Sequence, residues 1–286
     1  MAVQKKDEGY LMSEDHDEIR RLTLQHDMLK AELNGSLVFA PIDFSVPGLK
    51  VLDCGCASGY WLRDLCTALP NGKQHCYVGI DIQTSFFSPR PDPDQEPWLH
   101  LVNQSMQRPF PADWELSFDL VHMRFGLAAA VEWGPRKVVS HLVSLVKPGG
   151  WIQLVETDWT DVSGCGPVLA EAFKLFSELF DKMGTGADYG RRMHEWLAED
   201  GLETVITKPF SIRLGARNPN QGLQGVTTGA ICHAATTLSG IAMNGIPTSF
   251  SLQDLQTLVP RLKQELESQG GSYLLNVVCG RKPSTM

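Results

Sequence analysis

Apolar residues near the amino terminus recur at intervals of three and four residues. The stripe between residues 13 and 33 includes one histidine and comprises Ile19, Leu22, His26, Leu29 and Leu33. This spacing predicts one amphipathic helix that ends at the sequence Asn34-Gly35. A lone helix of this length is marginal in water, so we expect residues 13–48 to pack on the rest of the chain as a helical lid. The polar residues 1–12 are expected to form a flexible terminus.

From residue 49 onward, short apolar runs of strand length alternate with amphipathic helical segments. Such alternation is typical of βαβ units, in which a parallel sheet is covered by helices on both faces. The pattern therefore predicts an α/β fold. The predicted strands are residues 50–55, 75–82, 99–104, 117–126 and 150–156, and the predicted helices between them are residues 60–69 and 135–146.

Beyond residue 156 the strict alternation gives way to longer helices. Residues 167–183 and 189–200 are amphipathic at helical spacing, and two further strands are predicted at 210–215 and 272–282. We therefore expect the main domain to span residues 49–286, with helical insertions at about 159–200 and 217–270 that cap a substrate site.

Composition narrows the class of protein. The 286 residues are 43% hydrophobic and 20% charged, which is typical of a globular chain. A net charge of −8 argues against a nucleic-acid surface, and no apolar run approaches the roughly 20 residues of a membrane span. The amino terminus lacks a signal peptide, so we expect a cytoplasmic protein. The seven cysteines contain no CxxC pair, and the pattern indicates no metal site.

The most informative motif lies where the first strand of the main domain ends. Residues 53–59 (DCGCASG) form a glycine-rich turn between this strand and a helix. Such a turn brings the backbone close to a ligand at the carboxyl edge of the sheet. The second strand ends at Asp81, whose carboxylate can accept hydrogen bonds from both hydroxyls of a ribose.

Two cofactors suit this arrangement, a dinucleotide or S-adenosyl-L-methionine (SAM). A dinucleotide site uses the pattern GxGxxG to seat a pyrophosphate at a helix amino terminus. Here the turn is GxAxG, and the helix begins with Tyr60 and Trp61. The carboxylate of Asp53 would repel phosphate but suits a cofactor that carries an amino group and a sulfonium. The residues therefore favour SAM.

At this point the sequence resembles a known family. The turn, the acidic end of the second strand and the sequence KPGG at 147–150 resemble class I SAM-dependent methyltransferases, although Ala57 stands where that family usually has a glycine. The segments Arg21-Leu22, Gln25-His26, 35–42, 119–125 and 148–151 are similar to fungal LaeA/UMTA-like methyltransferases of secondary metabolism. The resemblance implies a Rossmann-like sheet of seven strands, mostly parallel, whose antiparallel last strand is inserted between the fifth and the sixth.

The resemblance also implies roles for individual positions. Asp53, Gly55, Ala57 and Gly59 would surround the methionine part of the cofactor, and Asp81 would hold the ribose. The other implied cofactor contacts are Ile82, Gln104, Ser105 and Met106 at the adenine, and Met123 and Arg124 beside the methyl donor.

The catalytic and substrate positions each have two interpretations. His26 is either a hydrogen-bonded core residue or, if its helix covers the pocket, a group that orients the substrate or takes its proton. Glu156 is a candidate base or an exposed loop carboxylate, and Arg124 could balance an acidic substrate or pair with a nearby acid. The candidates for the substrate wall, which could equally be core residues, are Trp61, Phe125, Trp159, Tyr189, His233 and Met243.

We therefore predict an enzyme that transfers a methyl group from SAM to an oxygen, nitrogen or sulfur of an apolar or aromatic small molecule of secondary metabolism, with S-adenosyl-L-homocysteine (SAH) as product. The resemblance suggests a nitrogen acceptor, as in diketopiperazine-type metabolites. No nucleic-acid or membrane partner is expected. Two alternatives stay open at this point: a LaeA-like regulator that binds SAM, and a methyltransferase-fold cyclase that transfers no methyl group.

Overall fold

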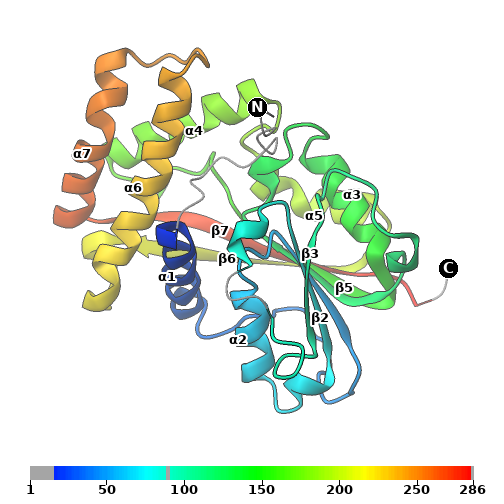
Figure 1. Cartoon of the computed structure of the whole chain (residues 1–286). Coiled ribbons are helices and arrows are strands. Elements are labelled where there is room, and N and C mark those ends of the chain that lie inside the picture. Colours follow the sequence, from blue (N-terminus) through cyan, green and yellow to red (C-terminus); the bar gives the residue numbers. More distant parts are fainter. Residues whose placement is uncertain (1–15, 88–90, 285–286) are drawn as a thin grey trace, which may run out of the picture.

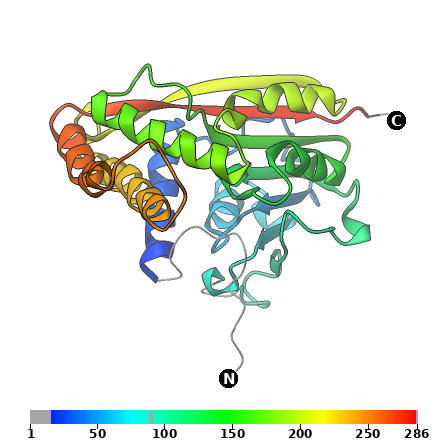
Figure 2. The same cartoon turned by 90° about the horizontal axis from the view of Figure 1, so that it is seen from above.

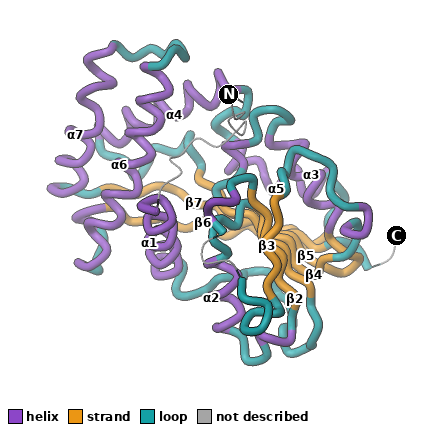
Figure 3. The backbone as a smooth tube through the Cα atoms, viewed as in Figure 1, coloured by secondary structure: helices purple, strands orange, loops and turns teal. Residues whose placement is uncertain are grey.

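A computed structural model describes residues 16–87 and 91–284, so the terminus expected at residues 1–12 lies outside the described residues. Seven strands form one sheet in the order β3-β2-β1-β4-β5-β7-β6 (Figures 1 and 3). The last strand is antiparallel to both of its neighbours, and the first five are mutually parallel. The predicted α/β fold is confirmed. The strands are β1 (Lys50–Cys54), β2 (Cys76–Asp81), β3 (Leu99–Asn103), β4 (Phe118–Arg124), β5 (Val146–Thr157), β6 (Glu203–Leu214) and β7 (Gly271–Arg281).

Helices cover both faces of the sheet (Figure 2). The longer helices are α1 (His16–Glu32), α2 (Tyr60–Ala68), α3 (Pro135–Leu145), α4 (Pro167–Met183), α5 (Tyr189–Glu199), α6 (Gln221–Met243) and α7 (Leu252–Ser268). Short 3-10 turns are η1 (Gly72–Gln74), η2 (Thr84–Phe86), η3 (Ala112–Trp114), η4 (Leu127–Ala129) and η5 (Gly215–Arg217). No helix among residues 16–87 and 91–284 has the length and apolar character needed to cross a membrane.

The alternation of side chains along the strands explains why a separate hydrophobic core lies on each face of the sheet. In β1, Val51 packs in the core shared with α2 and α4, whereas its neighbour Leu52 packs in the core shared with α3 and α5. Both side chains are fully buried, because successive strand residues point to opposite faces. A strand buried on both faces therefore appears in the sequence as a continuous apolar run.

The additional helices gather at one end of the sheet. Helices α4, α6 and α7 pack against one another, and α1 contacts α6 and the strand β6 (Figure 1). Met28 and Leu29 of α1 are 1% and 0% exposed and belong to the same core as the strands. Helix α1 is therefore an integral part of the domain surface that covers this end of the sheet.

One boundary differs clearly from the sequence prediction. Strand β6 begins at Glu203, seven residues before the predicted start, and none of the side chains in its first half, which is mostly polar, is buried. This strand lies at the edge of the sheet and, within the described part of the chain, pairs with β7 alone, so few of its side chains are buried. Pro209 is compatible with such an edge position, because an edge strand leaves one row of backbone groups unpaired.

Candidate active site

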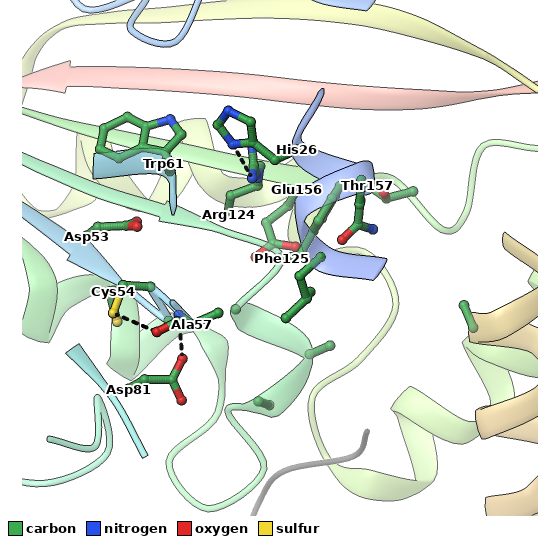
Figure 4. Close-up of a pocket in the computed structure, with 18 of the residues that line it drawn as sticks. His26, Asp53, Cys54, Ala57, Trp61, Asp81, Arg124, Phe125, Glu156 and Thr157 are labelled. Carbon is green, nitrogen blue, oxygen red and sulfur yellow. Dashed lines mark hydrogen bonds between the residues drawn. The ribbon is translucent and has the colours of Figure 1, made fainter. Parts of the chain in front are cut away.

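A cavity of about 350 Å³ opens at the carboxyl ends of β1, β2, β4 and β5 (Figure 4). Residues of α1 and of α6 also line it, so the walls come from segments far apart in the sequence. The volume and the mixture of apolar walls with a few polar groups are typical of sites for small molecules. This is also the edge where open α/β sheets bind ligands.

The glycine-rich turn lies at the end of β1. The amides of Gly55 and Cys56 donate hydrogen bonds to the carbonyl of Ile80 at 2.8 and 3.0 Å, which ties the turn to β2. Gly55 has a φ of 75°, and a Cβ atom built on it would meet no heavy atom of the described residues within 4 Å. Gly59 does not line the cavity, because a Cβ atom there would face Leu101 at 3.0 Å. Gly55 is therefore the position where the backbone is open to a ligand.

Ala57 lines the cavity in a backbone conformation that favours glycine. Its φ is 46°, in the left-handed region, where a residue with a Cβ atom is strained by about 1–2 kcal/mol. Its amide donates a hydrogen bond to Asp81 Oδ2 at 2.9 Å, which holds this conformation. The turn therefore forms without the glycine that is usual at this position.

The Ala57→Gly substitution should be well tolerated. Glycine removes the strain at this φ but gives the unfolded chain more conformational freedom, worth about 0.4–1 kcal/mol, so the two effects largely cancel. We expect the free energy of unfolding to stay the same or to rise by up to about 1 kcal/mol. Urea denaturation measures this directly, and a loss of more than about 1 kcal/mol would show that the methyl group makes a needed contact.

Asp81 is 8% exposed at the end of β2, and both of its carboxylate oxygens are held by the backbone. Besides the bond from Ala57, its Oδ1 accepts a hydrogen bond from the amide of Gln83 at 2.9 Å. Burial raises the pKa of this carboxyl, and the backbone hydrogen bonds oppose that shift. Each oxygen keeps a further lone pair with which it could accept a hydroxyl of a ribose.

The residues predicted for the adenine line the neighbouring part of the cavity: Ile82, Gln104, Ser105 and Met106. The side-chain amide nitrogen of Gln104 is occupied locally, since it donates to the carbonyls of Ser105 and Pro109 at 3.0 and 3.1 Å. Only the carbonyl oxygen of this amide is then available to a ligand.

Asp53, at the end of β1, is paired with a histidine that the sequence analysis missed. Its Oδ1 lies 2.8 Å from Nδ1 of His122 on the neighbouring strand β4, and the two residues are register partners. Burial lowers the pKa of His122, so the neutral ring donates its Nδ1–H to Asp53. The indole of Trp61 stacks on this imidazole, with 3.8 Å between ring centroids and 4° between planes. The sequence held one signal for this pair: His122 is a polar residue in the middle of the largely apolar strand 118–124.

Arg124 and His26 meet above the end of β4 (Figure 4). A terminal guanidinium nitrogen of Arg124 lies 3.3 Å from Nδ1 of His26, and Nε2 of His26 lies 2.8 Å from Asp64 Oδ2 on α2. His26 is 2% exposed and also lines the cavity, so burial in the core does not remove it from the candidate site. Burial, followed by the nearby charge of Arg124, lowers the pKa of His26.

Glu156 lies within β5 and is 1% exposed, so it is not an exposed loop carboxylate. Its Oε1 accepts a hydrogen bond from the amide of Leu127 at 2.8 Å. Burial raises its pKa to about 8, and hydrogen bonds from the amides of Leu127 and Gly126 limit that rise. A carboxyl with this pKa can exchange a proton near neutral pH.

The aromatic candidates Phe125, Trp159 and Tyr189 line the cavity beyond Glu156, and Trp159 Nε1 donates to the Tyr189 hydroxyl at 2.7 Å. Thus the structure brings the predicted catalytic and aromatic residues into one chamber.

Besides Gly59, three predicted positions do not line this cavity. Met123 is 0% exposed because it points into the core below Gly126, on the opposite side of β4 from Arg124. His233 turns toward Glu18 of α1, with 3.5 Å between Nε2 and Oε2, and Met243 is 45% exposed at the end of α6. The wall of α6 is instead built from Thr227, Ala230, Ile231, Ala234, Thr237 and Leu238, which the sequence analysis missed.

Comparison with known proteins agrees with this geometry. A methyltransferase-domain family model matches residues 29–205. The chain is 32% identical to the N-methyltransferase gliN of Aspergillus fumigatus over 99% of both chains. It is 29% identical to the secondary metabolism regulator laeA of Aspergillus niger over 51% of this chain and 36% of that one.

A solved structure shares the fold. Phosphoethanolamine N-methyltransferase 2 of Haemonchus contortus, in complex with SAM, superposes with a TM-score of 0.51 and 18% identity over 92% of this chain and 52% of that chain. The family match, the strand order and the turn at the carboxyl edge of the sheet agree with one another. The chain therefore belongs to the class I SAM-dependent methyltransferases, is an enzyme that uses SAM as its cofactor, and resembles the fungal LaeA-like members of that family.

Proposed function

We propose that this enzyme methylates a nitrogen atom of an uncharged, largely apolar secondary metabolite and that Glu156 accepts the proton that the nitrogen loses. The observation that carries the proposal is the buried carboxyl of Glu156, which opens into the cavity and has no cationic partner within 4 Å among the described residues. The name of the relative gliN, an N-methyltransferase, supports a nitrogen acceptor.

The residues present fit SAM. Gly55 leaves open space at the turn, which a bulky cofactor can approach. Asp53 offers a carboxylate to the amino group of the cofactor, Arg124 offers a guanidinium to its carboxylate, and Asp81 offers two oxygens to its ribose. One carboxylate and one guanidinium are thus available to the ammonium and the carboxylate of the methionine part of SAM.

When bound, SAM supplies a methyl group that is activated by its sulfonium sulfur. In its ionised form Glu156 would accept the proton that the acceptor N–H loses as the new N–C bond forms, and the amide of Leu127 stabilises the negative charge of the carboxylate before this transfer. The pKa of about 8 makes Glu156 a far stronger base than an exposed glutamate. Orientation of the acceptor in the chamber contributes the rest of the acceleration.

The substrate side of the chamber is lined mainly by aromatic and small residues. Phe125 and Trp159 form one wall, and the apolar and threonine side chains of α6 form another. Arg21, which lines the cavity from α1, is already paired with Glu18 at 2.7 Å. These walls favour an uncharged molecule with flat or aromatic parts. Action in the cytoplasm stays a prediction from the sequence.

Helix α1 serves as the lid over this chamber in our proposal. Leu22, Gln25, His26 and Met28 line the cavity from α1, while Leu29 anchors the helix in the core. A cover of this kind excludes water from the reacting groups. Residues 13–48 would then act together with the main domain rather than as a separate module.

Methyl transfer can be tested with SAM that carries a deuterated methyl group. The purified enzyme is incubated with this SAM and fungal metabolite extracts, together with cyclic dipeptides as defined probes. We expect a labelled product whose methyl group is placed on nitrogen by NMR. A methyl on oxygen or sulfur would contradict the nitrogen assignment, an altered product without label would indicate the cyclase alternative, and no product at all would favour the regulator.

The Asp81→Asn substitution should weaken SAH binding by tenfold or more. One oxygen of the carboxylate is replaced by a donor, so at least one charge-assisted hydrogen bond, worth about 1.5–3 kcal/mol, is lost. Isothermal titration calorimetry with SAH measures the loss. Asp113→Asn, at an exposed carboxylate of η3, is the matched control and should bind SAH normally. Equal affinities for the wild type and Asp81→Asn would remove Asp81 from the ribose site.

A further inference from the structure

Arg124 lines the cavity and has no ionic partner among the described residues. Within residues 16–87 and 91–284 no carboxylate lies within 4 Å of its guanidinium, and its one hydrogen bond is the contact with His26. The carboxylate of Asp53 is close enough to raise the pKa of Arg124, although burial has the larger, lowering effect. A guanidinium has five N–H donors, so several donors are left for a ligand.

The hydrogen-bond directions fix the state of His26. A guanidinium only donates, so Nδ1 of His26 must accept from Arg124 and carries no proton. The proton of the neutral ring is then on Nε2, which donates to Asp64 at 2.8 Å. Both ring nitrogens are used, and no lone pair of His26 is left to take a proton from a substrate.

The contacts around His26 hold its ring in one orientation. Lys30, one turn further along α1, donates to both carboxylate oxygens of Asp64 at 2.8 Å. The ring of Tyr60 meets the imidazole edge-on, with 4.9 Å between centroids. Through His26, helix α1 therefore reaches across to the guanidinium at the end of β4, and Asp64 of α2 supports that contact.

We infer that His26 is a positioning residue, which holds the guanidinium of Arg124 toward the carboxylate of the methionine part of SAM, and not the proton acceptor of the reaction. The inference rests on the proposed placement of SAM. Asp53 and Arg124 present opposite charges in the same region of the cavity, which matches the ammonium and carboxylate of an amino acid. His26 fixes the second of these charges without neutralising it.

Two ligands separate this role from a merely structural one. SAH carries the amino-acid end, whereas 5′-methylthioadenosine has the same adenosine and sulfur without it. We expect His26→Leu to weaken SAH binding about tenfold, the loss of one charge-assisted contact, and to change the affinity for methylthioadenosine by less than about twofold. We expect the same pattern of affinities for Arg124→Met, which serves as the second variant if His26→Leu does not fold.

Two further variants complete the test. His26→Gln keeps a donor for Asp64 and an acceptor on the same group, but it cannot exchange a proton at neutral pH. It should bind SAH within about threefold of the wild type and keep most of kcat. Lys174→Met removes an exposed lysine that pairs with Glu178 on α4 and contacts neither Asp64 nor Arg124, and it should retain the wild-type ratio of the two affinities.

The outcomes are distinct. Equal weakening of both ligands in His26→Leu, or no weakening of either, overturns the inference. If His26→Gln binds SAH normally but loses as much kcat as His26→Leu, His26 is the proton acceptor instead. The affinities for SAH and methylthioadenosine are measured without a methyl acceptor. They therefore test the role of His26 even if the acceptor atom proves not to be nitrogen.

Discussion

The Glu156→Gln variant should lose kcat by a factor of about 10² or more while its affinity for SAM stays within about twofold of the wild type. Glutamine keeps an oxygen that accepts the hydrogen bond from the amide of Leu127, so the local structure is preserved. It cannot take a proton from the acceptor nitrogen. A positioned base typically contributes 10²–10⁴ to the rate, which sets the size of the expected loss.

A buried glutamate outside the cavity provides the matched control. Glu265 is 7% exposed and accepts hydrogen bonds from the amides of Val168 and Leu169, both at 2.9 Å. Glu265→Gln therefore repeats the substitution at a buried glutamate that does not line the cavity, and it should keep kcat within about twofold. If Glu156→Gln turned over as fast as this control, Glu156 would not be the proton acceptor.

The pH dependence gives a second test of the same residue. A base acts in its deprotonated form, so the active fraction of the free enzyme grows as the pH rises toward the pKa of Glu156, about 8. We expect kcat/KM to increase nearly tenfold per pH unit between pH 6 and about 7.5 and to level off above about 8. Glu156→Gln should lack this rise. A wild-type rate that falls over the same range would instead indicate that Glu156 acts as an acid.

The sheet and its ligand-binding edge could be predicted because each depends on local patterns. The apolar runs marked the strands, and in βαβ units the carboxyl ends of parallel strands share one edge. This places Asp53 and Asp81 together without further information. The insertion of β7 between β5 and β6, by contrast, came from the family resemblance, since periodicity does not specify which strands pair.

The contacts that organise the site depend on tertiary register and could not be predicted. His122 reaches Asp53 only because β1 and β4 pair with these two residues opposite each other. The contact between His26, Asp64 and Arg124 joins α1, α2 and β4, which no local pattern relates. A one-residue step along β4 also decides that Arg124 meets the cavity and Met123 the core.

Helix α6 shows a different limit. Its sequence contains glycine, alanine and threonine on most sides, so no clear apolar stripe reveals which face is turned inward. His233 and Met243 were predicted to form part of the substrate wall, but they lie on faces turned away from the cavity. The inward face carries small residues, Ala230 and Ala234 among them, which leave room for a substrate.

The Gly55→Val variant should fold but lose detectable binding of SAM and SAH. Its Cβ atom would project into the open part of the cavity, where no described protein atom lies within 4 Å, so the valine methyl groups would occupy ligand space. The φ of 75° adds a cost of about 1–2 kcal/mol to the folded state, because a branched side chain is unfavourable in the left-handed region. A lower Tm alone would therefore be ambiguous.

Gly48 resolves this ambiguity, because it shares the backbone conformation of Gly55 without its location. Its φ is 80°, a Cβ atom there also meets no described heavy atom within 4 Å, and the residue is exposed outside the cavity. Gly48→Val should therefore lose stability to a similar extent but keep the full increase in Tm that saturating SAH gives the wild type, since a ligand stabilises only the state that binds it. In Gly55→Val that increase should vanish. Should Gly55→Val still be stabilised by SAH as strongly as Gly48→Val, the turn at residues 53–59 would not be the part of the chain that cradles the cofactor.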